Sequence, residues 1–213
     1  MVKNKQHIIF DWNGTLVDDA WVFVDVLNSL LKARQLNAIT IKEYRNLFCF
    51  PIKSFYKKIG VDVSKKSFLK LEQEFVFEYK KRMYDAQLFP DVFAFLGGLV
   101  GQGIKLSILS ASNQKILSAL IEYYQLSDYF DFIRGVNNYG AYGKVACGHD
   151  LLKAVKNKKE EVLLVGDTDY DYKISTNLQI DCVLVSNGHQ SKKRLKKTTN
   201  NVVASLSLLK INR

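Results

Sequence analysis

The sequence has few of the residues that build disulfide-bonded, zinc-binding or repeat proteins. Its three cysteines, Cys49, Cys147 and Cys182, form no CxxC pair and leave one over. This pattern fits isolated buried thiols in a reducing compartment and argues against a disulfide framework or a zinc site. The three histidines are equally scattered, and the two prolines are too few to mark a linker. No internal repeat or low-complexity segment occurs.

Long apolar runs are also missing. The N-terminal stretch reaches only Ile8, Ile9 and Phe10 before the acidic Asp11, so we expect no signal peptide and no membrane partner. We therefore expect a cytoplasmic protein. The chain has 213 residues and 47% hydrophobic content, enough to bury a substantial core in one large domain or in one domain with an insert.

Acidic residues are outnumbered, since 31 Lys and Arg stand against 21 Asp and Glu, for a formal net charge of +10. Much of the excess lies in Lys153 to Lys159 and in Lys192 to Lys197. A positive field attracts anions, and would help a phosphorylated metabolite to arrive or would serve nucleic acid. Each run also suits an ordinary solvated surface, and neither has the interleaved aromatics of single-strand binders. We expect a small phosphorylated metabolite as the partner, with nucleic acid as the alternative.

Short apolar runs rich in β-branched residues recur along the chain and predict buried parallel strands. They are Ile8–Phe10, Ile104–Leu109, Phe130–Ile133, Val162–Val165 and Cys182–Val185. Segments of helical period lie between them, for example 115–124 and 147–155. The alternation predicts an α/β fold with a doubly wound parallel sheet. Ligands bind beyond the carboxyl ends of such strands, where we expect Asp11, Ser110 and Asp167.

The region from Val17 to Leu88 breaks this alternation, because it is long, rich in aromatics and mostly helical in period. The helical stretches are 20–31, 41–47 and 68–84. We interpret residues 17–88 as an inserted α-helical cap domain, and residues 1–16 and 89–213 as the α/β core domain. The insert leaves the core just after Asp11, so it should cover the carboxylates as a lid. Its aromatic residues are expected to form its own core.

Two acidic clusters follow strands of the predicted sheet. Asp11 begins the turn Asp-Trp-Asn-Gly-Thr after the first strand, while Asp167 and Asp171 lie in Gly-Asp-Thr-Asp-Tyr-Asp after Val162–Val165. Carboxylates that converge from two strand ends make an oxygen-rich site of the kind that Mg²⁺ prefers. Such a site suits phosphoryl chemistry, with Asp11 as the candidate nucleophile.

Four short motifs, in this order, resemble those of the haloacid dehalogenase-like hydrolase superfamily, particularly its phosphoglycolate-phosphatase-like members with a helical cap after the first motif. The first motif is 11–15, the second contains Ser110, the third contains Lys144 in Tyr-Gly-Lys, and the fourth is 166–171. The resemblance covers nearly the whole chain. It implies a Rossmann-like α/β core and a phosphatase activity.

The resemblance also implies a mechanism and a cofactor. An aspartyl-phosphate formed on Asp11 would split one hard displacement into two easier ones. Mg²⁺ is implied to be held by Asp11, the backbone carbonyl of Asn13 and Asp167, with Asp171 supporting from close by. Asp169, between the last two, is expected at the surface.

The remaining motif residues are implied to bind the phosphoryl group. Ser110 would donate a hydrogen bond to its oxygens, and Lys144 would act as a point charge. Thr15 either adds a donor to the phosphate or caps the turn. Taken without the other motifs, Lys144 would be interpreted as a surface lysine in so basic a chain.

Asn13 departs from the family pattern. Phosphatases of this superfamily have an aspartate there, which protonates the leaving alkoxide and then activates water, and an amide does neither. Such general acid–base help is typically worth about two to four powers of ten in rate.

Three interpretations of Asn13 stay open. In the first, the substrate has a leaving group that needs no proton, as in an acyl or aryl phosphate, and the protein is a slow phosphatase. Alternatively, the chain resembles phosphonoacetaldehyde hydrolases, whose first motif also lacks the acid and which cleave a C–P bond through a lysine Schiff base; Lys53 is then the candidate, although it also fits a surface lysine. In the third, hydrolysis is lost and the protein binds a phosphorylated ligand or a macromolecule.

Overall fold

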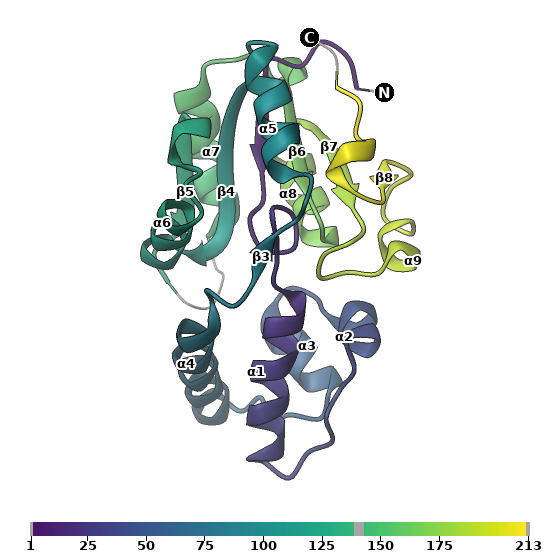
Figure 1. The fold of residues 1–213 in the computed structure, drawn as a ribbon. Coiled ribbons are helices and arrows are strands. Elements are labelled where there is room, and N and C mark those ends of the chain that lie inside the picture. The colour runs from purple at the N-terminus through teal and green to yellow at the C-terminus, as the bar shows by residue number, and fades with distance from the viewer. Residues whose placement is uncertain (1, 139–142, 212–213) are drawn as a thin grey trace.

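A six-stranded parallel sheet forms the centre of the molecule (Figure 1); the computed structural model describes residues 2–138 and 143–211. The strands are β1 (His7–Phe10), β4 (Lys105–Asn113), β5 (Phe132–Val136), β6 (Val162–Gly166), β7 (Asp181–Val185) and β8 (Val202–Val203). They lie in the order β5-β4-β1-β6-β7-β8. The chain therefore builds outward on one side of β1 and then restarts on the other side, at β6. Open α/β sheets bind ligands at such a reversal, beyond the carboxyl ends of the strands.

The sheet is covered on both faces, as the sequence predicted. In β1, Ile8 and Phe10 belong to one apolar cluster and Ile9 to a second one, because successive side chains of a strand point to opposite faces. Two helices, α5 (Val92–Gly101) and α6 (Gln114–Tyr123), pack into the first cluster. Two more, α7 (Lys144–Val155) and α8 (Asp169–Leu178), pack into the second. Figure 1 shows α5 in front of the sheet and α8 behind it, so the doubly wound α/β prediction is confirmed.

Four helices form a separate layer beyond the carboxyl ends of the strands (Figure 1). They are α1 (Ala20–Lys32), α2 (Ile41–Leu47), α3 (Ile52–Lys58) and α4 (Lys65–Arg82), and together we call them the helical layer. The chain enters and leaves it through β2 (Val17–Asp18) and β3 (Gln87–Leu88), which pair with each other in an antiparallel two-stranded sheet. The boundaries of a cap domain at residues 17 and 88 stay a prediction.

Two strand ends differ from the sequence-based expectation. The strand predicted to end at Leu109 continues through Ser110 to Asn113, with a register shift on the way. The polar run that follows Leu109 hides this extension, because apolar periodicity is the signal that marks a buried strand. The strand predicted from Phe130 begins two residues later, at Phe132, since Phe130 is buried as part of the loop. The short helix α9 (Lys192–Leu195) follows β7. No described helix has the length and apolar character needed to cross a bilayer.

Candidate active site

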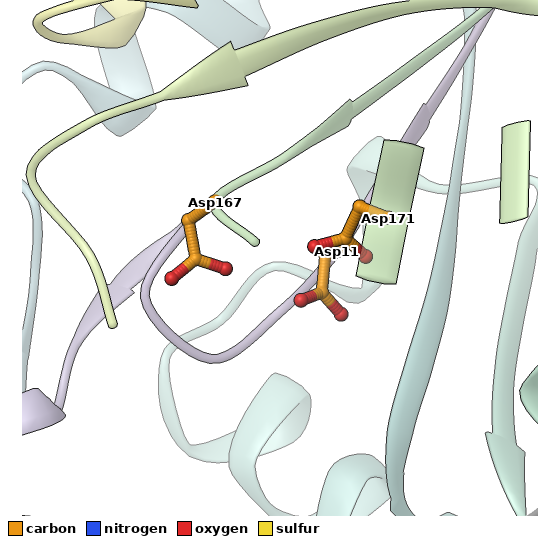
Figure 2. Close-up of side chains that lie close together, drawn as sticks. All are labelled: Asp11, Asp167 and Asp171. Atoms are coloured by element: carbon orange, nitrogen blue, oxygen red, sulfur yellow. The ribbon is translucent and has the colours of Figure 1, made fainter. Parts of the chain in front are cut away.

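Three buried carboxylates meet at the reversal of strand order (Figure 2). Asp11 follows β1, Asp167 follows β6, and Asp171 lies in the first turn of α8. One carboxylate oxygen from each lies within 4.8 Å of the other two. Because Phe10 and Val165 are partners in the parallel β1–β6 pair, the chain leaves both strands at the same edge. The carboxylates that the sequence predicted to converge are therefore close together in the structure. They come from parts of the chain that are far apart, since Thr15, near Asp11, and Asp167 are separated by 152 residues.

Lys144 joins two of these carboxylates. Its Nζ donates to Oδ1 of Asp11 at 2.8 Å and to Oδ1 of Asp171 at 2.6 Å, and the residue is only 1% exposed. Burial disfavours its charge, but Asp11 and Asp171 outweigh burial and raise the pKa of Lys144. The site thus keeps a fixed positive charge beside the candidate nucleophile. Tyr142, which precedes Lys144 in the third motif, lies outside the described residues.

The carboxylates carry more negative charge than Lys144 can balance. Burial, together with the neighbouring Asp171, raises the pKa of Asp11 to about 6. Burial also raises the pKa of Asp167 to about 8, against the opposing effect of His189. Three hard oxygen donors in a buried, net negative cluster are a donor set that fits Mg²⁺.

Two glycines allow the chain to pass close to Asp167. Gly14 has a left-handed backbone, with φ of +72°, and a Cβ there would lie 2.3 Å from Oδ2 of Asp167. A Cβ on Gly188 would lie 2.2 Å from the same oxygen and 2.2 Å from the carbonyl oxygen of Gly14. The space is needed because Oδ2 of Asp167 accepts a hydrogen bond from the backbone N–H of His189. Glycine at both positions thus fixes where this carboxylate lies.

The amide of Asn13 is held by partners on both of its ends. Its Oδ1 accepts from the hydroxyl of Ser112 at 2.6 Å, and its Nδ2 donates to Oδ2 of Asp19 and, at 3.3 Å, to the hydroxyl of Tyr79. Asp19 is 1% exposed, and its Oδ1 also accepts from the backbone N–H of Gly14 at 3.0 Å. This network uses the donor of the amide as well as its acceptor. A carboxylate at position 13 would instead face the carboxylate of Asp19.

His189 was missed in the sequence analysis and lies inside the site. Its ring is 3% exposed and packs edge-on against Phe23, with the ring centroids 4.8 Å apart. Nε2 donates to Oδ1 of Asp19 at 3.1 Å, and Nδ1 pairs with the hydroxyl of Tyr44 at 2.7 Å. Burial opposes protonation, but the hydrogen bond to Asp19 outweighs it and raises the pKa of His189. The position just after a predicted strand, at the same sheet edge as Asp11, was the available signal.

The loop after β7 fastens the helical layer to the sheet. The guanidinium of Arg45, in α2, donates to the carbonyl oxygens of Gly188 and Asn187, each at 2.8 Å. In return, the backbone N–H of Ser191 donates to the carbonyl of Arg45 at 3.0 Å, and Gln190 donates to the carbonyl of Phe48 at 3.0 Å. These bonds hold α2 over the carboxylates.

A cavity of about 150 Å³ lies between the carboxylates and the helical layer. Its floor includes Asp11, Asn13, Ser110, Lys144 and Asp167, while most of its wall consists of aromatic and aliphatic side chains of α1 to α4. Of the predicted site residues, Asp11, Asn13, Asp167, Ser110 and Lys144 therefore open into one space that the helical layer borders, whereas Asp171 and Thr15 do not line it. Aromatic residues expected to form only the core of the insert also line this cavity.

Other predicted residues take different positions. The hydroxyl oxygen of Ser110 accepts from the backbone N–H of Ser112 at 3.0 Å, which leaves its proton to donate into the cavity. Thr15 is fully buried and its hydroxyl donates to Asp167 at 3.5 Å, so its role toward phosphate stays a prediction. Asp169, expected at the surface, is partly exposed: its side chain is 17% exposed and pairs with Arg194 at 2.8 Å. Sequence could not reveal this pair, because Arg194 belongs to a distant basic run.

Comparisons with known proteins identify related sequences and structures. The family model of haloacid dehalogenase-like hydrolases matches residues 8–185. A phosphoglycolate phosphatase from Aquifex aeolicus is 26% identical over 172 residues, which cover 77% of this chain and 76% of the relative. One from Caulobacter vibrioides is 26% identical over 200 residues, covering 87% and 81%. A solved hydrolase of the haloacid dehalogenase-like family from Streptococcus pneumoniae shares the fold, with a TM-score of 0.80 at 21% identity over 99% of this chain and 94% of that one.

The chain therefore belongs to the haloacid dehalogenase-like hydrolase family, because the family model covers most of its length. Within that family it is a phosphatase-like member, as the resemblance of its four motifs indicated.

Proposed function

We propose that this protein is a Mg²⁺-dependent hydrolase of a small phosphomonoester that acts through an aspartyl-phosphate on Asp11. The observation that carries the proposal is the contact of Asp11 with Lys144, beside Asp167 and Asp171, where Asp11, Lys144 and Asp167 line a cavity under the helical layer. We also propose that residues 17–88 act as a cap domain, which covers the reacting groups and keeps bulk water away.

Each side chain then has a defined task. The free oxygen of the Asp11 carboxylate attacks phosphorus while the bond from phosphorus to the leaving oxygen breaks. Ser110 donates to a phosphoryl oxygen, and Lys144 supplies positive charge to the transferring group. Water then attacks the aspartyl-phosphate, which releases inorganic phosphate and regenerates Asp11. Bound Mg²⁺, held by Asp11, Asp167, Asp171 and the backbone carbonyl of Asn13, supplies further charge neutralisation.

Asn13 gives the leaving oxygen no proton, because its amide is neither an acid nor free of its partners. A leaving group of low pKa departs without that help, so we expect the rate to depend strongly on leaving-group pKa. We therefore expect slow hydrolysis of alkyl esters and faster hydrolysis of activated esters.

Mg²⁺ should raise the melting temperature of the protein, and by more at about pH 8 than at about pH 6. The raised pKa of Asp167, about 8, means that the folded protein binds more protons than the unfolded chain at neutral pH. Metal-free stability therefore falls as the pH rises toward that value, and a divalent cation at the carboxylates opposes the loss. Differential scanning fluorimetry in EDTA and in millimolar Mg²⁺ measures both effects, and phosphatase activity should vanish in EDTA.

The control for this experiment is Asp150→Asn, which removes an exposed carboxylate paired with Lys153. It should keep the full Mg²⁺ effect, whereas Asp167→Asn should lose it. A melting temperature that does not respond to Mg²⁺ at either pH contradicts the metal site.

Replacing Gly188 with alanine should lower kcat/KM for an activated phosphate ester by about 10²-fold, the usual cost of moving a reacting group by about 1 Å. The new Cβ would lie 2.2 Å from Asp167 Oδ2 and must push this carboxylate away. Steady-state kinetics in saturating Mg²⁺ measure the loss. Gly98→Ala, in α5 with open space around its Cβ, is the matched control and should keep the wild-type rate. Equal activity of the two variants would show that the position of Asp167 is not critical.

The two other interpretations gain less support. Lys53 is exposed on α3, with its ammonium 5.8 Å from the centre of the Phe68 ring, and the cavity lining does not include it. Nothing in the described residues therefore aims this amine at Asp11, as C–P cleavage through a Schiff base requires. The lysines of both basic runs are exposed, which suits nucleic acid and a solvated surface equally well.

A further inference from the structure

The wall of the cavity is shaped for an aromatic group. Eight aromatic rings from residues 17–88 line it, among them Phe23, Phe48, Phe50, Phe55, Phe75 and Tyr79. The volume of about 150 Å³ matches that of an apolar cavity that holds a benzene-sized molecule. Aromatic rings pack well against one another in offset or edge-to-face arrangements, so such a wall favours a ring over a short polar chain.

The charges at the cavity disfavour an acidic substrate. Among the described lining residues, Lys144 and His189 are the basic groups, and both lie at the floor with carboxylate partners. A carboxylate carried by the substrate into the wall would find no cation there and would lose its hydration without compensation. The relatives from Aquifex aeolicus and Caulobacter vibrioides are phosphoglycolate phosphatases by name, and phosphoglycolate carries such a carboxylate. Its fit to this cavity is therefore poor.

Glu72 adds an acidic side chain to the wall, which favours a cationic group on the substrate over an acidic one. It lies in α4 among the lining residues, and its Oε1 is buried with no hydrogen-bond partner in the structure. A buried acceptor without a partner costs free energy that a ligand donor can recover. A cationic group on the substrate that approaches Glu72 from the cavity would give this carboxylate a partner.

The residues at the floor of the cavity also favour an aromatic leaving group, for an independent reason. Asn13 cannot protonate the departing oxygen, and a phenol oxygen needs a proton far less than an alkoxide does, since its pKa is about 10, as in tyrosine. An aromatic leaving group thus suits both the missing acid at the floor and the rings of the wall.

We propose that the substrate of this site is an aryl phosphate whose ring carries an ammonium group, with the ring seated among the aromatic side chains and the ammonium directed at Glu72. The proposal rests on the function proposed above. In the reaction, the phosphoryl group passes from the phenol oxygen to Asp11 and then to water, and the phenol leaves with its ammonium unchanged.

A set of matched esters tests the proposal on the full chain in Mg²⁺. The probes are the phosphate esters of tyramine, of phenol and of 3-(4-hydroxyphenyl)propionate, which differ at the far end of the ring, together with phosphoglycolate. Acetyl phosphate is added because it is activated but has no ring. We expect kcat/KM to fall from tyramine phosphate through phenyl phosphate to the carboxylate-bearing ester. The first should exceed the last by about 10- to 100-fold, the usual effect of a hydrogen bond to a charged group.

Variants of α4 connect this preference to Glu72. In Glu72→Gln the ratio between the ammonium and carboxylate esters should fall toward one, and in Glu72→Lys it should invert. Glu78→Gln is the matched control, since Glu78 lies on the same helix, pairs with Lys81 and should leave the ratio unchanged. Because the readout is a ratio within each variant, partial loss of folded protein does not affect it.

The possible outcomes are distinct. Hydrolysis of acetyl phosphate with rejection of every aryl ester overturns the substrate class and leaves the proposed function standing. A preference for the carboxylate ester or for phosphoglycolate, or a ratio unchanged in Glu72→Gln, also overturns the substrate class. If the protein hydrolyses none of the probes, the proposed function fails and the substrate class fails with it.

Discussion

Replacing Asp11 with asparagine should reduce the hydrolysis of an activated aryl phosphate to the background rate, a loss of at least about 10⁴-fold. The amide is too weak a nucleophile to attack phosphorus. It also deprives Lys144 of one of the two carboxylates that hold its ammonium in place. The substitution keeps the shape of the side chain and removes one of several crowded negative charges, so the variant should fold. Steady-state kinetics and a melting curve measure both expectations.

The intermediate gives this prediction a second readout. During turnover of a ³²P-labelled ester, the wild-type protein should carry an acid-stable label that hydroxylamine releases, as an acyl phosphate does. The Asp11→Asn variant should carry none. Asp150→Asn, which changes an exposed aspartate, should behave as wild type in both assays. Turnover that survives in Asp11→Asn would mean that another group attacks phosphorus.

Exchanging the polar groups of Asn13 and Asp19 should raise kcat/KM for an alkyl phosphomonoester by about 10²- to 10⁴-fold, the range of general acid–base catalysis. The double variant Asn13→Asp/Asp19→Asn places the carboxylate at the cavity, where the leaving oxygen departs. The amide at position 19 can donate to it and can still accept from the backbone N–H of Gly14, as Asp19 does now. The hydrogen bonds among these residues are thus kept, while the carboxylate is transferred from position 19 to position 13.

The single variant Asn13→Asp should gain much less. It sets two carboxylates at hydrogen-bond distance, where like charges oppose ionisation of both and one must keep a proton. It also removes the amide N–H of Asn13 that now donates to Asp19, so the melting temperature should fall. Kinetics on an alkyl and an aryl ester separate these effects, because an aryl leaving group gains little from an added acid. Asp19→Asn serves as the control for the loss of Asp19, and a double variant with no gain on the alkyl ester would show that proton supply does not limit the reaction.

Local sequence pattern determined the scaffold and the reacting carboxylates. Short apolar runs of strand length, separated by helical period, require a covered parallel sheet, and the chain must leave parallel strands of such a sheet at one edge. Asp11 and Asp167 each come directly after such a run, which is why their meeting was predictable. Lys144 was different. Its sequence surroundings suit a surface lysine, and only the resemblance of the third motif indicated the burial that the structure shows.

The tertiary structure alone decided the partners of the buried polar groups. His189 and Asp19 are 170 residues apart in sequence and 3.1 Å apart in space. From its motif alone, Asn13 indicates only that the usual acid is missing. In the fold, its amide is the hydrogen-bond partner that Asp19 and Ser112 require. Glu72 is an ordinary helix residue by sequence, yet it lines the cavity and one of its oxygens is buried without a partner. Apolar burial follows from periodicity along the chain, whereas a buried polar atom is satisfied by whichever distant group the packed layers bring to it, and no local pattern encodes that encounter.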